Sequence, residues 1–155
     1  MTTPIVKEIE IDAELELVWK AWIDEQRITL WFAPAAKVEP EIGGRFELFF
    51  DPSNKDRMGT KGCTILELEE PCLLVFEWKG PDDFETVMNR GDELTVVRVE
   101  FAPEGQGTKI RLVHSGWGSS PAWSEAKEWH EAAWDQVLGS LKSEMESGEG
   151  VLCCK

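Results

Sequence analysis

The carboxy-terminal stretch Ser124–Glu146 places the strongest constraint on the fold, because it carries one long apolar stripe at helical spacing. With about 100° per residue, one face of the predicted helix centres on Trp134. The side chains within roughly 60° of it are Trp123, Lys127, His130, Val137, Leu138, Leu141 and Met145. A helix of about six turns gains most of its stability from the face that it buries. We therefore expect the rest of the chain to supply a large apolar surface for this helix.

Length and charge favour one globular domain with no affinity for nucleic acid. The 155 residues suffice for a single substantial core, and we expect residues 1–147 to form it, followed by a flexible tail at 148–155. The net charge of −14 repels phosphate backbones and anionic headgroups. The sequence shows no secretory leader and no run of about 18 apolar residues, so we expect a cytoplasmic protein that binds no membrane.

The cysteines and aromatic residues give little sign of redox, metal or hydroxyl chemistry. Cys63 and Cys72 fall in neighbouring predicted strands, where we interpret them as small buried apolar residues rather than a disulfide. Cys153 and Cys154 form a vicinal pair in the tail, and no spacing typical of a zinc site occurs. Eight Trp, seven Phe and no Tyr leave the core with few hydroxyl groups. We expect no metal and no cofactor.

The chain order is a strand, two short helices, six strands and the long helix. Ile5–Ile11 alternates apolar and polar residues, as a half-buried strand does. A helix follows to Ile23, and Asp24 can cap a second short helix. The further strands are expected at 37–39, 45–50, 62–69, 72–78, 94–101 and 108–114. The last two strands should turn inward the residues Thr95, Val97, Val99, Phe101, Thr108, Ile110, Leu112 and His114.

This order predicts an α+β domain in which a curved antiparallel sheet wraps around the terminal helix. The two short helices would close one end. The segment 79–92 is rich in Gly, Pro and Asp but also carries Phe84, Val87 and Met88. It is either a lid or a loop folded onto its own sheet, and the sequence leaves both open.

Four stretches in this order resemble a known family. They are Leu30-Trp31-Phe32, Pro40–Phe46, Gly107–Trp117, and a pattern of His130, Trp134, Leu138 and Leu141 on the long helix. Together they resemble the activator-of-heat-shock-chaperone-ATPase-homologue-like family, within the START and polyketide-cyclase-like superfamily. The resemblance covers about Ile5 to Met145, nearly the whole chain.

The resemblance implies a helix-grip fold: six or seven antiparallel strands grip a carboxy-terminal helix over an apolar cavity, without a metal or a universal cofactor. Relatives in the superfamily bind lipids, hormones or polyketides, and a minority catalyse cyclisation or dehydration. The family often has Gly before the helix Trp. This chain has Ala133 there, a small change that still permits close packing.

Two histidines and a set of apolar residues are the candidate site. The side chains expected to line the cavity are Trp31, Phe32, Phe46, Leu48, Phe76, Trp78, Val97, Leu112 and Trp134. His114 and His130 could meet the same cavity and bind an anionic or carbonyl-bearing ligand, or move a proton. The alternative is a pair of core histidines satisfied by backbone carbonyls or by the indole of Trp117.

The favoured function is a non-enzymatic module, monomeric or homodimeric, that binds a hydrophobic small molecule in the cavity. One alternative is an interaction protein that contacts a chaperone through its acidic surface. Another is a cyclase- or dehydratase-type enzyme that uses His114 and His130 for acid–base chemistry.

Overall fold

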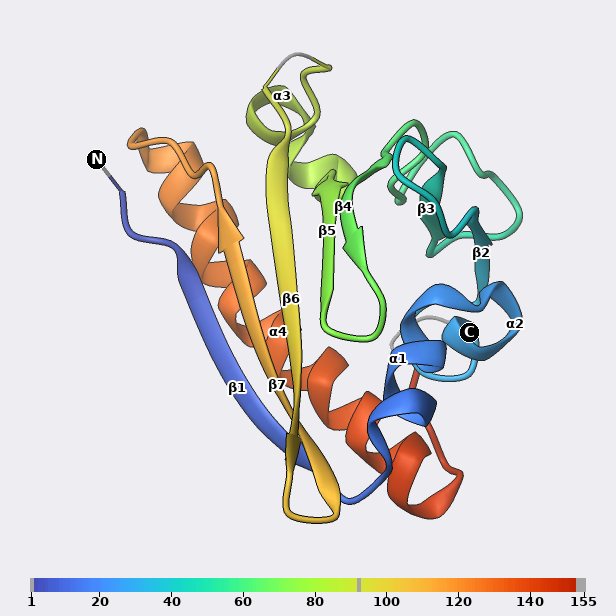
Figure 1. The fold of residues 1–155 in the computed structure, drawn as a ribbon. Helices are drawn as coiled ribbons and strands as arrows, with labels where there is room; N and C mark the ends of the chain where they lie inside the picture. Colours follow the sequence, from blue (N-terminus) through green and yellow to red (C-terminus); the bar gives the residue numbers. More distant parts are fainter. Residues whose placement is uncertain (1, 92, 153–155) are drawn as a thin grey trace.

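The computed structural model describes residues 2–91 and 93–152 as a five-stranded antiparallel sheet with a long helix across one face (Figure 1). In chain order the elements are β1 (Ile5–Ile11), α1 (Leu15–Ile23), α2 (Glu25–Ile28), β2 (Ala35–Val38), β3 (Phe46–Phe49), β4 (Ile65–Glu69), β5 (Leu73–Trp78), η1 (Asp82–Phe84), α3 (Glu85–Met88), β6 (Thr95–Glu104), β7 (Gly107–Ser115) and α4 (Pro121–Ser147). The strand order in the large sheet is β1-β7-β6-β5-β4. The α+β helix-grip prediction is confirmed.

The strands that were expected as one sheet of six or seven divide into two sheets. β2 and β3 pair only with each other as a ladder, and the other five strands of the described residues form the large sheet. Two single bridges, Arg45 with Thr64 and Phe49 with Gly59, join β3 to the segment before β4. The pair therefore extends the sheet without a continuous ladder.

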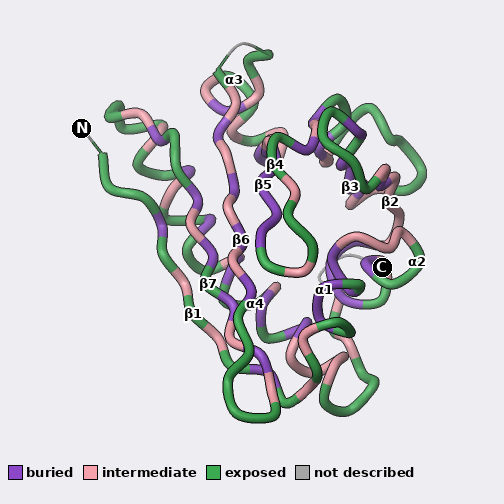
Figure 2. Tube along the Cα trace, viewed as in Figure 1, coloured by how far each residue is buried: buried purple, intermediate pink, exposed green. Residues whose placement is uncertain are grey.

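The inward face of β6 and β7 forms the centre of the core. All eight residues predicted to point inward from these strands are buried, from Thr95 at one end to Phe101 and Thr108 at the other. Figure 2 shows buried and less buried residues alternating along β6, as the two-residue period of a strand requires. The strands run further than predicted, because Glu104 pairs with Gly107 across a two-residue turn. Gly105 makes that turn possible with φ of 61°.

The helical pair packs its tryptophans into the same core. Trp19 and Trp22 of α1 are fully buried, and Asp24 caps α2 as predicted, because its Oδ1 accepts from the N–H of Gln26 at 2.9 Å. The indole Nε1 of Trp31, after α2, donates to the carbonyl of Ala21 at 3.0 Å. The Trp19 ring lies 5.2 Å from that of Phe101 on β6, so the pair packs against the sheet at the end away from α3 (Figure 1).

Helix α4 begins three residues before the predicted start, because Ser120 caps it and Pro121 occupies its first turn. It ends at Ser147, and the following Gly148, with φ of 75°, forms a left-handed cap. The predicted stripe is buried at His130, Trp134, Leu138 and Leu141, whereas its other members are half-buried. Half-buried Lys127 extends its Nζ to the hydroxyl of Thr3 at 3.1 Å.

Residues 79–91, the described part of the segment 79–92, fold onto α4 rather than onto their own sheet. They include η1 and α3, the side chain of Met88 is fully buried, and the Phe84 ring lies 6.0 Å from that of Trp129. An apolar contact with the terminal helix explains why a surface connection holds these residues. Whether the segment also acts as a lid stays a prediction.

The end of the described chain turns back along α4. The N–H of Gly150 donates to Glu144 Oε2 at 2.9 Å, and that of Val151 donates to Ser140 Oγ at 2.7 Å. The flexibility expected for residues 148–155 stays a prediction, and the vicinal pair at 153 and 154 lies outside the described residues.

The two described cysteines are free thiols in different surroundings. Cys63 is buried as expected, and burial raises its pKa to about 12, so it is protonated and unreactive. Cys72 is exposed, which corrects the expectation of a buried residue. It occupies the turn before β5, where the chain reverses at the surface.

Candidate ligand-binding site

A groove of about 380 Å³ opens between the middle of α4 and the segments that follow β3 and β5. Its wall is almost entirely apolar. The lining residues are Phe32, Phe50, Met58, Gly59, Trp78, Lys79, Gly80, Pro81, Trp129, His130, Ala132, Ala133, Trp134, Gln136 and Val137. Pockets that bind small ligands typically hold about 300–1,000 Å³, so this groove lies at the small end of that range.

Three aromatic rings from different elements form the floor of the groove. Trp78 ends β5, Trp134 lies at the centre of the α4 stripe, and Phe32 follows α2. Their ring centroids are 5.2 to 5.9 Å apart, within the range of favourable aromatic pairs. Each of the three side chains is almost fully buried, so packing against its neighbours holds the floor in place.

Small residues keep the groove open. Ala132 and Ala133 line it from α4, and the backbones of Gly59 and Gly80 line it from the opposite side. A Cβ at Gly80 would lie 2.4 Å from the sulfur of Met88, so no larger residue fits there without movement. The rim is aromatic again, because Trp129 is 47% exposed and lies beside this wall.

Asp82 joins the two loops on the sheet side of the groove. Its Oδ1 accepts from the N–H of Met58 at 3.0 Å, and its Oδ2 pairs with Arg57 Nε at 3.4 Å. Met58 has φ of 50°, an uncommon value for a side chain other than glycine. The hydrogen bond that Met58 donates to Asp82 thus stabilises Met58, which lines the groove, in a backbone conformation that is rare for residues other than glycine.

His130 lies at the inner end of the groove with both ring nitrogens engaged. Trp78 Nε1 donates to His130 Nε2 at 3.1 Å, and an indole nitrogen can only donate. The proton of the neutral ring therefore sits on Nδ1, which donates to the carbonyl of Ala126 at 2.7 Å. Burial lowers the pKa of His130 to about 4, despite the opposing effect of the Ala126 carbonyl.

His114 is engaged in the same way but lies in the core, behind the groove. Its Nδ1 accepts from Trp134 Nε1 at 3.0 Å, so Nε2 carries the proton and donates to Thr95 Oγ1 at 2.8 Å. Burial lowers its pKa well below the ordinary value, and nearby His130 adds to the effect. The ring of Trp117 packs against it with centroids 4.4 Å apart.

These bonds leave neither histidine a nitrogen for a ligand or a proton transfer. At neutral pH both rings are uncharged, and each has one donor and one acceptor already used inside the protein. The arrangement matches the interpretation as satisfied core histidines. The backbone carbonyl expected as a partner is that of Ala126, which bonds His130, whereas the indoles that donate to the two rings are those of Trp78 and Trp134 rather than that of Trp117. The geometry gives no support to acid–base catalysis by this pair.

Of the eleven residues predicted to contact a ligand, four line the groove: Phe32, Trp78, His130 and Trp134. The other seven lie in the core and do not line it: Trp31, Phe46, Leu48, Phe76, Val97, Leu112 and His114. Their inward direction was predicted correctly. Phe46 and Phe76 stack on each other, and Trp22 of α1 packs against Trp31 and Phe76, so other side chains fill the space beside them. A sequence pattern does not show such pairings. Ligand contact stays a prediction for all eleven.

Sequence reasoning missed the rim of the groove. Trp129 is adjacent to His130, and Met58 lies in a polar loop without periodicity, so neither belongs to a predicted apolar face. The available signal in the sequence was a large aromatic residue, Trp129, next to His130 but outside the predicted apolar face. In the described part of the chain no three metal-ligating side chains cluster. Of the described helices, none combines the length and apolarity that a bilayer crossing requires.

A family model for "Activator of Hsp90 ATPase homolog 1-like protein" matches residues 12–146, which is most of the chain. The chain belongs to this family. The match begins after β1 and extends through almost all of α4, so it includes every residue that lines the groove. No curated protein matches the sequence significantly.

Solved structures share the fold of this family member. The Aha1 dimer from Colwellia psychrerythraea is 18% identical with a TM-score of 0.77, over 96% of this chain and 100% of that one. PFC0360w, an HSP90 activator from Plasmodium falciparum, is 21% identical with a TM-score of 0.68, over 95% and 96%. DynU16, a protein in the dynemicin biosynthetic locus, is 18% identical with a TM-score of 0.71, over 97% of this chain and 49% of that one.

Proposed function

We propose that this protein binds an apolar small molecule in the groove between α4 and the ends of β3 and β5. The observation that carries the proposal is the aromatic floor of Phe32, Trp78 and Trp134 beneath about 380 Å³ of open space. Two of these side chains are tryptophans whose N–H groups point into the protein, to His130 and His114. Their ring faces are therefore what a ligand would meet.

Because the three rings are only 2 to 5% exposed, most of the apolar surface that leaves water on binding would belong to the ligand. A ligand that removes about 200 Å² of apolar surface from water gains roughly 5 kcal/mol before the entropic cost of association. The floor is already packed, so little further ordering opposes binding. The histidines contribute by fixing the two indoles rather than by contacting the ligand's polar groups.

The test fills the groove from α4 with a larger side chain. Ala133→Leu places a branched side chain in the groove at a half-buried helix position, whereas Ala122→Leu makes the same change at an exposed position of α4 outside the groove. We expect Nile red, a neutral apolar fluorophore, to bind the unmodified protein. Ala133→Leu should weaken it at least about tenfold and Ala122→Leu should not.

Thermal unfolding of both variants serves as the folding control. An Ala133→Leu protein that unfolds at the normal temperature and still binds the dye with full affinity would overturn the proposal. So would an unmodified protein that binds no apolar probe.

A second candidate function is contact with a chaperone through the acidic surface. The description of the family and the net charge of −14 favour it. A partner with a basic surface should then be recovered in a pull-down at low salt and lost at high salt, because screening weakens such contacts. Recovery that is insensitive to salt would contradict a charge-driven contact.

A further inference from the structure

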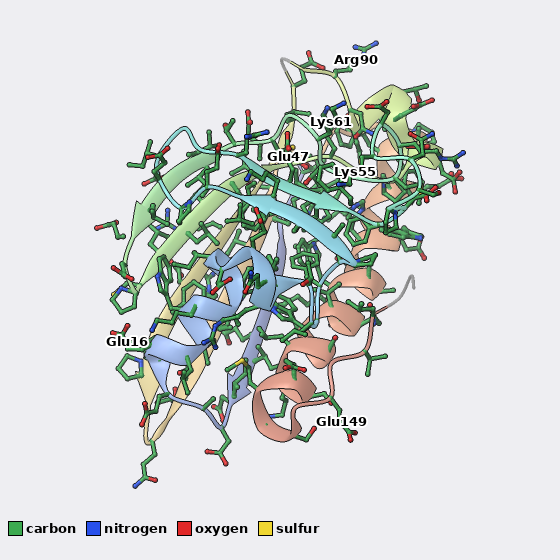
Figure 3. All side chains as sticks on the ribbon, turned by 90° about the vertical axis from the view of Figure 1, so that its right-hand side faces the viewer. Glu16, Glu47, Lys55, Lys61, Arg90 and Glu149 are labelled. Atoms are coloured by element: carbon green, nitrogen blue, oxygen red, sulfur yellow. The ribbon has the colours of Figure 1, made fainter. Side chains whose placement is uncertain are left out.

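The chain that follows α4 is held along the helix as a strap, which we define as residues 148–151. The N–H of Val151 donates to Ser140 Oγ at 2.7 Å, and Gln136 Nε2 donates to the carbonyl of Val151 at 2.9 Å. Figure 3 shows the chain from Glu149 running back beside α4 rather than away from it. Gln136 lies one turn nearer the start of α4 than Ser140, so the strap runs antiparallel to the helix.

The strap also fits closely against the chain that follows α2. A Cβ on Gly150 would lie 2.1 Å from the carbonyl oxygen of Leu30 and 3.2 Å from Cα of Trp31, so only glycine fits there without a shift. The Ser140 hydroxyl that accepts from Val151 donates to the carbonyl of Trp31 at 2.8 Å. The strap is therefore fixed on two sides.

Both of these sides lead to the open side of the groove, which we call its mouth. On α4, Gln136 bonds the strap and lines the groove, and Ala132 and Ala133 line it about one turn further along the helix. On the other side, Phe32 of the aromatic floor directly follows Trp31. The strap therefore reaches the edge of the groove at Val151.

The segment that follows the strap, residues 152–155, is long enough to cross the mouth. One helical turn spans about 5.4 Å, whereas four extended residues span about 13 Å. The sequence of this segment is Leu-Cys-Cys-Lys, in contrast to the polar Ser-Gly-Glu-Gly at 147–150, and thiols pack as small apolar groups. Leu152 is half-buried, and residues 153–155 lie outside the described part of the chain.

We propose that Leu152 and the two cysteines after it cover the mouth of the groove when no ligand is bound, and that a ligand must displace them. The inference rests on the proposed binding function and adds a regulation of that site by the protein's own chain. The strap makes the competition effective, because a short tether gives a segment an effective concentration on the order of millimolar.

The expected size of the effect follows from the fraction of molecules in which the mouth is covered. An apparent Kd equals the intrinsic Kd divided by the fraction that can bind. A segment that covers the mouth in about four molecules of five therefore weakens every ligand of the groove about fivefold.

The first test removes the segment and measures the affinity for Nile red by fluorescence titration. A chain that ends at Val151 keeps the bonds of the strap and loses residues 152–155. We expect it to bind the dye about fivefold more tightly than the full chain. Unchanged affinity would overturn the proposal. Weaker binding would overturn it too, because the segment would then form part of the binding wall.

The second test displaces the strap and keeps the full chain. Gly150→Ala places a Cβ against the carbonyl of Leu30, so the strap must shift, and the affinity for Nile red should rise as in the shortened chain. Gly139→Ala is the matched control, at an exposed position of α4 where a Cβ would meet no atom within 4 Å. It should leave the affinity unchanged. Equal affinities in the two variants would contradict the role of the strap.

Thiol labelling tests the covered state without any ligand. Ala133→Leu fills the groove, so iodoacetamide should alkylate Cys153 and Cys154 about fivefold faster in this variant than in the unmodified protein. Ala122→Leu, outside the groove, should leave the rate unchanged. Mass spectrometry of the peptide that contains both cysteines measures the rates. Equal rates in all three proteins would overturn the proposal.

The two proposals fail in different ways. If Nile red binds and Ala133→Leu blocks it, but the shortened chain binds no more tightly, the apolar groove stands and the covering segment falls. If neither the full chain nor the shortened chain binds Nile red, the binding function itself falls.

Discussion

His114 and His130 are held neutral by indole donors, and this makes the fold sensitive to acid. In the unfolded chain each ring takes up a proton near pH 6.5, whereas folded His130 does so only near pH 4 and His114 at a pH well below 6.5. Between these values the unfolded state binds more protons. The free energy of unfolding should therefore fall by up to about 1.4 kcal/mol per pH unit for each histidine as the pH drops below 6.5.

Urea denaturation between about pH 7 and pH 5 measures this loss, above the range where ordinary carboxylates titrate. His130→Gln should flatten the profile, because it removes one of the two groups. A profile that is already flat in the unmodified protein would contradict the assignment of buried neutral rings.

The bond from Trp78 to His130 also predicts an asymmetry between two groove tryptophans. Trp78→Phe leaves Nε2 of His130 buried without a donor and creates a small cavity, so we expect a loss of about 2–4 kcal/mol in the free energy of unfolding. Trp129→Phe makes the same change at a half-exposed ring and should cost less than about 0.5 kcal/mol. Equal losses in urea denaturation would argue against the bond.

At the scale of elements, the start of α4 depends on one side chain. Ser120 Oγ accepts from the N–H of Trp123 at 3.3 Å, and Ser119 precedes it at an exposed position. Ser120→Ala should lower the free energy of unfolding by about 1 kcal/mol, as the loss of a helix cap does. Ser119→Ala is the matched control and should change it little. Thermal or urea unfolding of the two variants makes the comparison, and equal values would contradict the cap.

At the scale of the whole molecule, charge repulsion opposes folding. The net charge is −14, and the ion pairs among described residues are mostly exposed, so each contributes little. Raising the ionic strength with sodium chloride from about 10 to 200 mM should stabilise the fold by on the order of 1 kcal/mol, because screening relieves the repulsion. Potassium chloride should act alike. A fall in stability with either salt would show that the ion pairs outweigh the repulsion.

Local sequence patterns predicted most of the helices and strands, because the formation of these elements depends on residues that are near one another in the chain. The two-residue period identified β1 and the inward faces of β6 and β7, and the helical period identified α4. Element ends were less accurate, as at Glu104 and Gly107, where a tight turn extended both strands through residues that resembled a loop. The separation of β2 and β3 from the large sheet depends on long-range pairing and was not predicted.

The sequence by itself determined that a Trp-bearing helix is buried against a sheet, because periodicity states which side chains must leave water. Only the tertiary structure decided where open space remains. Phe32, Trp78 and Trp134 come from three elements, and their distances depend on how those elements pack. The same holds for His130, whose role follows from an indole 52 positions away in the chain. A pattern gives the direction of a side chain, whereas a groove is the volume that all of them together leave unfilled.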